Sequence, residues 1–246
     1  MDTRQFILIT GASSGIGEAC AVNLSGKFRL VLAGRNKSKL DKVIEKCDNK
    51  GKHLVWCCDL AIERDNIASS LTALLREHDI AISTYVHCAG VSKICPFKSV
   101  PNAYVNEIFN VNFFSAVEII QVLLKRVNQS ALENIVLISS VSSIRADKGN
   151  SIYAASKGAM NALVTTLSSE LAPSVRVNAI APGTTDTPMS SEFIERNRET
   201  LNQSIPLGIG RVDDIANYVE YLISDKARWI TGQTIIVDGG LTTIGV

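Results

Sequence analysis

The chain has 246 residues, 46% of them hydrophobic, and its 25 basic and 24 acidic side chains leave a formal net charge of +1. That length and apolar content suffice to bury one large core, so we expect a single domain over residues 1–246. The balanced charge, without a basic tract, argues against nucleic acid or a membrane surface as a partner.

Short apolar runs alternate with helical stretches along the chain. The runs that we predict as strands are residues 6–10, 29–33, 53–57, 84–87, 135–139, 176–181 and 234–237. This alternation predicts an α/β fold, a Rossmann-like doubly wound parallel sheet of about seven strands with helices on both faces. In such sheets the ligand crevice lies beyond the carboxyl ends of the strands. The residues that would gather there are Gly11, Asp59, Gly90, Ser140 and Gly183.

The first predicted strand leads into a glycine-rich turn, Thr10-Gly-Ala-Ser-Ser-Gly-Ile-Gly17, and then into a helical stretch. Glycines in this turn permit a tight bend and let backbone N–H groups at the start of the helix approach a pyrophosphate. The spacing G-x-x-x-G-x-G departs from the usual G-x-G-x-x-G fingerprint of dinucleotide sites. By itself the turn therefore predicts a phosphate near a helix N-terminus, with a plain strand-to-helix loop as the alternative.

A long helix is predicted over residues 105–127, and its apolar residues occupy more than one stripe. They are Val105, Ile108, Phe109, Val111, Phe113, Phe114, Val117, Ile119, Ile120, Val122, Leu123 and Leu124. The predicted helix 153–171 is similar. Because a helix that is apolar beyond its sheet-facing side must bury the excess elsewhere, we expect a homo-oligomer, a dimer or a tetramer, packed through these two helices.

Tyr153 and Lys157 lie four residues apart, which places a phenol and an ammonium on one face of a helix. A lysine cation held close favours the phenolate, so we expect Lys157 to lower the pKa of Tyr153 from about 10 towards working pH. The pair predicts general acid–base chemistry. An ordinary helix-surface pair is the alternative, and the upstream Ser140 and glycine-rich turn favour the catalytic interpretation.

Residues 184–210 are polar and helical in parts, and we expect them to form a mobile lid over substrate. No apolar run approaches the roughly 20 residues that a membrane span needs. Residues 1–6 show no signal-peptide pattern, so we expect a cytoplasmic protein. The cysteines at 20, 47, 57, 58, 88 and 95 and the histidines at 53, 78 and 87 show no metal-ligand spacing. We therefore expect reduced cysteines and no metal site.

Taken together, these motifs resemble the short-chain dehydrogenase/reductase family over nearly the whole chain. The matching strings, in order, are Thr10 to Gly17, Asp59-Leu60, Ala89-Gly90, Asn110-Val-Asn112, Ser139-Ser140, Tyr153 with Lys157, Arg176 to Gly183, Thr187, Thr231 to Thr234 and Val237 to Gly240. The C-terminal half is most similar to the 3-oxoacyl-thioester (3-oxoacyl-ACP) reductase branch, which also contains sugar, steroid and secondary-alcohol enzymes. The resemblance implies an oxidoreductase that transfers a hydride between a nicotinamide cofactor and a carbonyl or secondary alcohol.

The resemblance also implies roles for individual residues. Tyr153 would donate a proton to the substrate oxygen and Ser140 would hydrogen-bond the same atom. Lys157 would hold the nicotinamide ribose, and Asn112 would position water in a relay to it. The residues expected at the cofactor are Gly11, Ser13, Ser14, Gly15, Ile16, Gly17, Arg35, Asp59, Leu60, Ala89, Gly90, Tyr153, Lys157, Pro182, Gly183, Thr185 and Thr187. The alternatives are a strand-end turn residue for Ser140 and a helix-bending amide for Asn112.

The end of the second predicted strand indicates which nicotinamide is used. NAD enzymes commonly carry Asp or Glu there, which accepts hydrogen bonds from the ribose hydroxyls. This chain has Gly34 in that place and Arg35 after it, so a guanidinium can bind a 2′-phosphate, with Ser14 adding a hydroxyl. We therefore expect NADP(H). A solvated loop arginine is the alternative.

Two departures from the family pattern limit what the resemblance implies. His87-Cys-Ala-Gly90 stands where the family usually has Asn-Asn-Ala-Gly, so a bracing amide is missing and Cys88 would lie beside the cofactor. Residues 171–176 carry no basic residue before Ser174, although carrier-protein reductases tend to present one there. This argues against a carrier-protein partner and favours a small-molecule carbonyl or alcohol substrate. A sugar or small-ketone reductase and a catalytically silent nucleotide-binding regulatory protein remain as alternatives.

Overall fold

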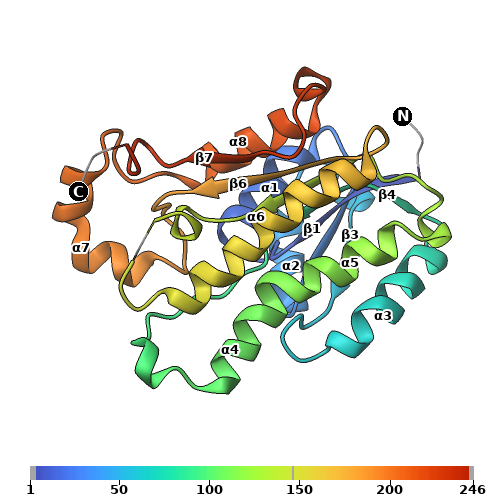
Figure 1. Cartoon of the computed structure of the whole chain (residues 1–246). Coiled ribbons are helices and arrows are strands. Elements are labelled where there is room, and N and C mark those ends of the chain that lie inside the picture. The colour runs from blue at the N-terminus through green and yellow to red at the C-terminus, as the bar shows by residue number, and fades with distance from the viewer. Residues whose placement is uncertain (1–3, 146, 244–246) are drawn as a thin grey trace.

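Seven parallel strands form one sheet in the order β3-β2-β1-β4-β5-β6-β7 in the computed structural model, which describes residues 4–145 and 147–243 (Figure 1). The strands are β1 (Gln5–Thr10), β2 (Leu30–Gly34), β3 (Leu54–Cys57), β4 (Ala81–His87), β5 (Asn134–Ile138), β6 (Arg176–Pro182) and β7 (Thr234–Val237). The order runs outwards from β1 in one direction and from β4 in the other. The predicted doubly wound, Rossmann-like sheet is therefore confirmed.

Helices cover both faces of the sheet (Figure 1). They are α1 (Gly15–Ser25), α2 (Lys37–Ile44), α3 (Arg64–Glu77), α4 (Asn102–Phe109), α5 (Ser115–Leu123), α6 (Ser151–Leu171), α7 (Ser191–Ser204) and α8 (Val212–Ile223). The core of one face combines side chains of α1, α2 and α8, and that of the other combines α3, α5 and α6. Within the described part of the chain, none of these helices is long and apolar enough to cross a bilayer.

The alternation of side chains along β1 shows why the sequence folds into layers. Ile7 and Ile9 belong to the core under α1, whereas Leu8 belongs to the core under α6. Successive side chains of a strand point to opposite faces, so a strand covered on both faces must be apolar at nearly every position. The strand predicted to begin at residue 84 in fact begins at Ala81 (β4). The reason is that the Ala81 N–H already donates a hydrogen bond to the carbonyl of Arg4 at 2.9 Å.

The predicted helix over residues 105–127 is wrong in its detail. α4 is followed by a π-helical turn, Asn110–Phe114, which continues into α5, and the α-helix ends at Leu123. The Asn128 amide explains this end, since it donates to the Leu123 carbonyl at 3.1 Å and binds both the N–H and the carbonyl of Ile82. The π-helical turn matters for function because it carries Asn112.

Candidate active site

The turn between β1 and α1 is built for close backbone approach. Gly11 and Gly15 have φ of +65° and +58°, the left-handed region that favours glycine. A Cβ added at Gly11 would lie 2.7 Å from the backbone nitrogen of Ala89, and one added at Gly17 would lie 2.3 Å from the Gly11 carbonyl oxygen. The turn therefore lies against the end of β4, and the side chain of Ser14, which precedes α1, does not cap the first N–H groups of the helix. This cradle fits a cofactor pyrophosphate.

The turn also reaches the end of β2. A Cβ at Gly34 would lie 3.7 Å from Ser13 Oγ, so these two residues are neighbours. Ser14 and Arg35 are both exposed. The Arg35 carbonyl accepts a bond from Cys57 Sγ at 3.6 Å, while its guanidinium makes no hydrogen bond or ion pair with the described residues. The arrangement could hold an anion between the turn and the strand end.

The segment after β6 returns to the glycine-rich turn. Gly183 follows Pro182 directly, and a Cβ there would lie 2.7 Å from the Cα of Asp238. Thr185 pairs with Gly210 across the base of the predicted lid. The Thr187 side chain lies 3.4 Å from the Cβ position of Gly15. These contacts bring the expected cofactor residues of the two halves of the chain to one place.

Asp59 and Leu60 are less directly placed. The Asp59 carboxylate accepts a bond from the Ala61 N–H at 2.9 Å, so it closes its own loop. Leu60 is buried in the core under α3. The Asp59 N–H donates to Glu63 Oε2 at 3.2 Å, so the backbone of this residue is also engaged within the loop.

The four predicted catalytic residues come from three elements at the same edge of the sheet. Tyr153 and Lys157 lie on α6, Ser140 directly follows Ser139 at the end of β5, and Asn112 lies in the π-helical turn. Ser140 is a neighbour of Tyr153 and, through hydrogen bonding, acts to lower the pKa of its phenol. Lys157 Nζ lies 5.7 Å from the centre of the Tyr153 ring. One surface thus presents a hydroxyl, a phenol and an ammonium together.

Asn112 is fully buried and held on both sides of its amide. Its Oδ1 accepts from the Val91 N–H at 2.8 Å, and its Nδ2 donates to Ser156 Oγ at 3.0 Å and to the Val91 carbonyl at 3.1 Å. A Cβ at Gly90 would lie 3.6 Å from both Asn112 Oδ1 and Lys157 Nζ. Asn112 therefore fixes the segment after β4 against α6, close to the lysine.

The expected electrostatic effect of Lys157 on Tyr153 is not what the structure shows. Lys157 is 3% exposed, and its Nζ donates to the Ile138 carbonyl at 2.7 Å rather than to the phenol. Burial lowers the pKa of Lys157 to about 8. Burial also raises the pKa of Tyr153, an effect that the Ser140 hydrogen bond opposes. The expectation that Lys157 lowers the pKa of Tyr153 is wrong here because the ammonium is turned towards a strand-end carbonyl.

His87 packs behind the site, although the sequence predicted no metal-binding role for it. It is fully buried at the end of β4, and its Nδ1 lies 2.7 Å from Tyr85 Oη and 2.9 Å from Thr10 Oγ1. Burial and the charge of Lys157 lower its pKa to about 3, so the ring is neutral at ordinary pH. The signal available in the sequence was its place in the string His87 to Gly90, where the family carries an amide.

The predicted lid contains α7 and packs on a small core of its own. Ile194, Leu201 and Ile205 are buried together with Val141, which follows β5, and Leu241. Met189 and Phe193 are 55% and 43% exposed. The segment is therefore anchored on one side and presents apolar side chains on the other.

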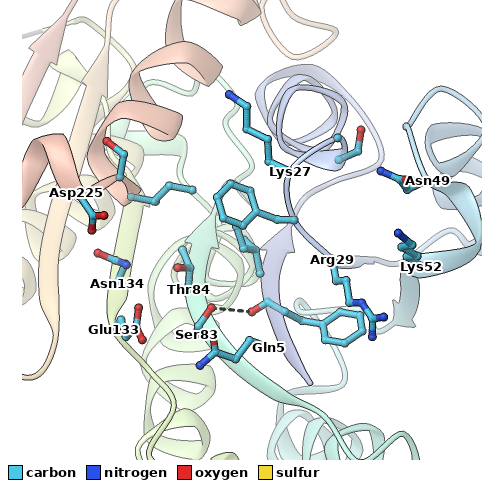
Figure 2. A pocket seen from close by; sticks show the side chains of 17 residues that line it. Gln5, Lys27, Arg29, Asn49, Lys52, Ser83, Thr84, Glu133, Asn134 and Asp225 are labelled. Atoms are coloured by element: carbon cyan, nitrogen blue, oxygen red, sulfur yellow. Dashed lines mark hydrogen bonds between the residues drawn. The ribbon is translucent and has the colours of Figure 1, made fainter. Parts of the chain in front are cut away.

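A separate pocket lies at the opposite edge of the sheet (Figure 2). Its volume is about 570 Å³, and Arg29, Ser83 and Asn134 are among the residues that line it, at the amino ends of the strands. None of the predicted site residues lines this pocket. The candidate active site is thus confined to the carboxyl edge, as expected for a doubly wound sheet.

Comparison with known proteins identifies the family. A protein-family model described as enoyl-(acyl carrier protein) reductase matches residues 11–242. The chain is 32% identical over 238 residues to the 3-oxoacyl-[acyl-carrier-protein] reductase FabG of Thermotoga maritima, which covers 95% of this chain and 96% of the relative. It is also 32% identical over 244 residues to a tropinone reductase homolog of Arabidopsis thaliana, covering 97% of this chain and 90% of that protein.

Solved structures agree with the sequence relatives. A short-chain dehydrogenase/reductase from Brucella melitensis superposes with a TM-score of 0.88 at 29% identity, covering 98% of this chain and 97% of that one. A 4-hydroxyisoleucine dehydrogenase complexed with NADH gives a TM-score of 0.89 at 28% identity, covering 98% and 100%. The chain therefore belongs to the short-chain dehydrogenase/reductase family, oxidoreductases that act on CH–OH groups with a nicotinamide cofactor.

Proposed function

We propose that this protein is an NADP(H)-dependent reductase of the 3-oxoacyl type, acting on a small-molecule carbonyl or the corresponding secondary alcohol. The observation that carries the proposal is the convergence of Ser140, Tyr153 and Lys157 beside Gly90, at the edge of the sheet where the glycine-rich turn lies. A nucleotide-binding protein without turnover needs no phenol held against a serine hydroxyl and a buried lysine.

A nicotinamide supplies or accepts the hydride at the substrate carbon, which leaves the protein to manage the charge on oxygen. Because its pKa is raised, Tyr153 is protonated at neutral pH and can act as the proton donor in the reducing direction. Ser140 contacts the phenol and can donate a hydrogen bond to the same substrate oxygen. Lys157 lies beside this pair, with its Nζ 5.7 Å from the centre of the Tyr153 ring, and would hold the nicotinamide ribose.

The preference for NADP(H) is supported by the end of β2. Gly34 occupies the place where a carboxylate would repel a 2′-phosphate, and the neighbouring Arg35 guanidinium is exposed and uses none of its donors on the described residues. Ser13 Oγ lies close to Gly34 and Ser14 is exposed beside it, so hydroxyls are available at the same spot. Arginine binds phosphate through parallel N–H bonds, which favours the phosphorylated cofactor.

The rim of the crevice supports a substrate with an apolar part. Ile94, Ile144 and Met189 are 67%, 57% and 55% exposed and lie on the segments that follow β4, β5 and β6. These segments leave the sheet at the edge that carries Tyr153. Apolar side chains there suit an acyl chain better than a sugar, whose hydroxyls require polar partners. The FabG relative, which is named for a 3-oxoacyl substrate, points in the same direction.

A substrate panel tests the proposal. The purified protein is supplied with NADPH and, in turn, 3-oxoacyl thioesters, small ketones and keto sugars, and the loss of NADPH absorbance is measured. We expect the highest kcat/KM with a 3-oxoacyl thioester. Preference for a sugar would establish the alternative reductase. NADPH binding without turnover of any member would favour the regulatory protein.

A further inference from the structure

Two cysteines that are far apart in the sequence meet behind the glycine-rich turn. Cys20 lies on α1 and is fully buried, and Cys88 directly follows β4 and is partly buried. Val86 faces the core under α1, so Cys88, two residues later, is directed to the same face. Cys88 packs against the cluster that contains Cys20, and the neighbouring Cys88 thiol raises the pKa of Cys20.

The pair joins two parts of the cofactor cradle. Cys20 belongs to the helix whose first turn approaches the pyrophosphate. A Cβ at Gly11 would lie 2.9 Å from the carbonyl carbon of Cys88, so the backbone of Cys88 already touches the turn. Cys88 is also near enough to Lys157 to favour its charged form. A change at the thiol pair therefore acts on both walls of the site.

The other cysteines have other surroundings. The side chain of Cys47 bonds Ser25, Cys58 interacts with Glu63, and Cys57 donates to the carbonyl of Arg35. Cys95 donates to the carbonyl of Pro96. These thiols serve as internal controls, since they experience the same oxidant.

We propose that Cys20 and Cys88 form a reversible disulfide that weakens cofactor binding. The consequence of this disulfide rests on the proposed function, whereas its chemistry does not. The oxidant is a hydroperoxide. The Cys88 thiolate attacks its oxygen, an S–O bond forms as the O–O bond breaks, and hydroxide or alkoxide leaves and takes a proton. Cys20 sulfur then displaces the sulfenic oxygen as water. With hydrogen peroxide, two thiols lose two electrons and two protons, and the peroxide becomes two waters.

The order of attack follows from exposure. The neighbouring Cys88 thiol and burial raise the pKa of Cys20 well above its usual value, and the residue has no exposed surface. Cys88 is only partly buried, so it has an exposed side and meets the oxidant first. A bound cofactor would cover that side of Cys88 and slow the first step.

The consequence for the site follows from geometry. A disulfide holds its sulfurs at about 2 Å, closer than two thiols that are not bonded, so we expect its formation to draw α1 and the end of β4 towards each other. Gly11 and Ala89 are already packed backbone to backbone and cannot absorb the shift locally. A displacement of about 1 Å in a positioned site lowers turnover by roughly 10²-fold, and we expect a loss of that order.

Mass spectrometry tests the link directly. The wild-type protein is exposed to hydrogen peroxide, its remaining thiols are alkylated, and the digested peptides are mapped. We expect a peptide that joins Cys20 to Cys88 and disappears on treatment with dithiothreitol. In Cys20→Ala, Cys88 should instead be trapped as a sulfenic acid by dimedone, whereas Cys95→Ser should still form the link. If the exposed Cys57 is oxidised while Cys20 and Cys88 are still free thiols that can be alkylated, the proposal is overturned.

A binding titration separates the switch from the proposed function. NADPH fluorescence is followed with reduced, oxidised and re-reduced wild-type protein, and with oxidised Cys88→Ser. We expect the dissociation constant to rise by about tenfold or more in the linked form, to recover on reduction and to stay unchanged by peroxide in Cys88→Ser. A linked protein that binds NADPH as before would overturn the switch. A reduced protein that binds no NADPH would instead count against the proposed function.

Discussion

Among single residues, His87 makes the clearest prediction about pH. Its pKa falls from 6.5 in the unfolded chain to about 3 in the folded protein. Below pH 6.5 the unfolded chain therefore binds a proton at His87 that the folded protein does not bind. The contribution of the neutral ring to the free energy of unfolding is therefore fully present above pH 6.5 and is lost as the pH falls towards 3. Urea unfolding on both sides of pH 6.5 measures it. His87→Asn should remove this part of the pH dependence, and an unchanged slope in that variant would contradict the explanation.

Arg35 makes the prediction about cofactor choice. One charge-assisted contact contributes about 1.5–3 kcal/mol, which is about 10- to 150-fold in affinity. We expect Arg35→Ala to weaken NADPH binding by that factor and to leave NADH binding nearly unchanged. Lys39→Ala, which removes another exposed cation close by on α2, is the matched control and should change neither. Equal affinity of the wild type for both cofactors would count against the assignment.

At this scale the sequence predicted which side chains meet but not how they are charged. Spacing along one helix placed Tyr153 beside Lys157, and order along the chain placed Ser140 at the same edge. The direction of the Lys157 ammonium depends on a carbonyl at the end of β5, which no local pattern reveals. The pKa shifts of Tyr153 and His87 follow from burial, a property of the assembled core.

Among the elements, the turn into α1 tolerates the least change. Alanine favours a helix over glycine by about 1 kcal/mol, but a Cβ at Gly17 would meet the Gly11 carbonyl oxygen at 2.3 Å. Because backbone cannot move aside as a side chain can, the clash outweighs the propensity. We expect Gly17→Ala to lower the free energy of unfolding by about 1–3 kcal/mol and to weaken NADPH binding.

A matched glycine gives the control for that substitution. Gly51 is exposed in the short helical turn before β3, and an added Cβ there meets nothing within 4 Å. Gly51→Ala should change the free energy of unfolding by no more than about 0.5 kcal/mol. Equal effects of the two substitutions in urea unfolding would show that close approach is not the reason for Gly17.

The apolar pattern of the sequence predicted some elements and missed others. Strands were predictable because both faces of the sheet are covered, which makes each strand a nearly continuous apolar run. The π-helical turn around Asn112 was not, since a single extra residue in a turn barely alters the apolar pattern. The end of α5 depends on Asn128 binding a strand that lies far away in the sequence.

At the scale of the whole molecule, we propose a homodimer or homotetramer packed through α4–α5 and α6. Much of the apolar surface of these helices faces the core, but Leu124 is 46% exposed, and Phe113 and Val117 are only partly buried. Sedimentation at micromolar concentration should give a species larger than the monomer. Ala162→Arg, on the exposed side of α6, should shift it towards the monomer, whereas Lys52→Arg should not. A monomeric wild type would reject this assembly.

The most direct test of the proposed function is the Tyr153→Phe variant. The fold does not need the phenolic hydroxyl, while proton transfer to the substrate oxygen does, so NADPH binding should persist as turnover disappears. General acid–base assistance typically contributes a factor of about 10²–10⁴ to the rate. We therefore expect kcat to decrease by a factor in that range with the best carbonyl substrate of the panel. A variant that binds NADPH and retains more than about a tenth of the wild-type kcat would contradict the central claim, because its loss of rate would be smaller than that factor.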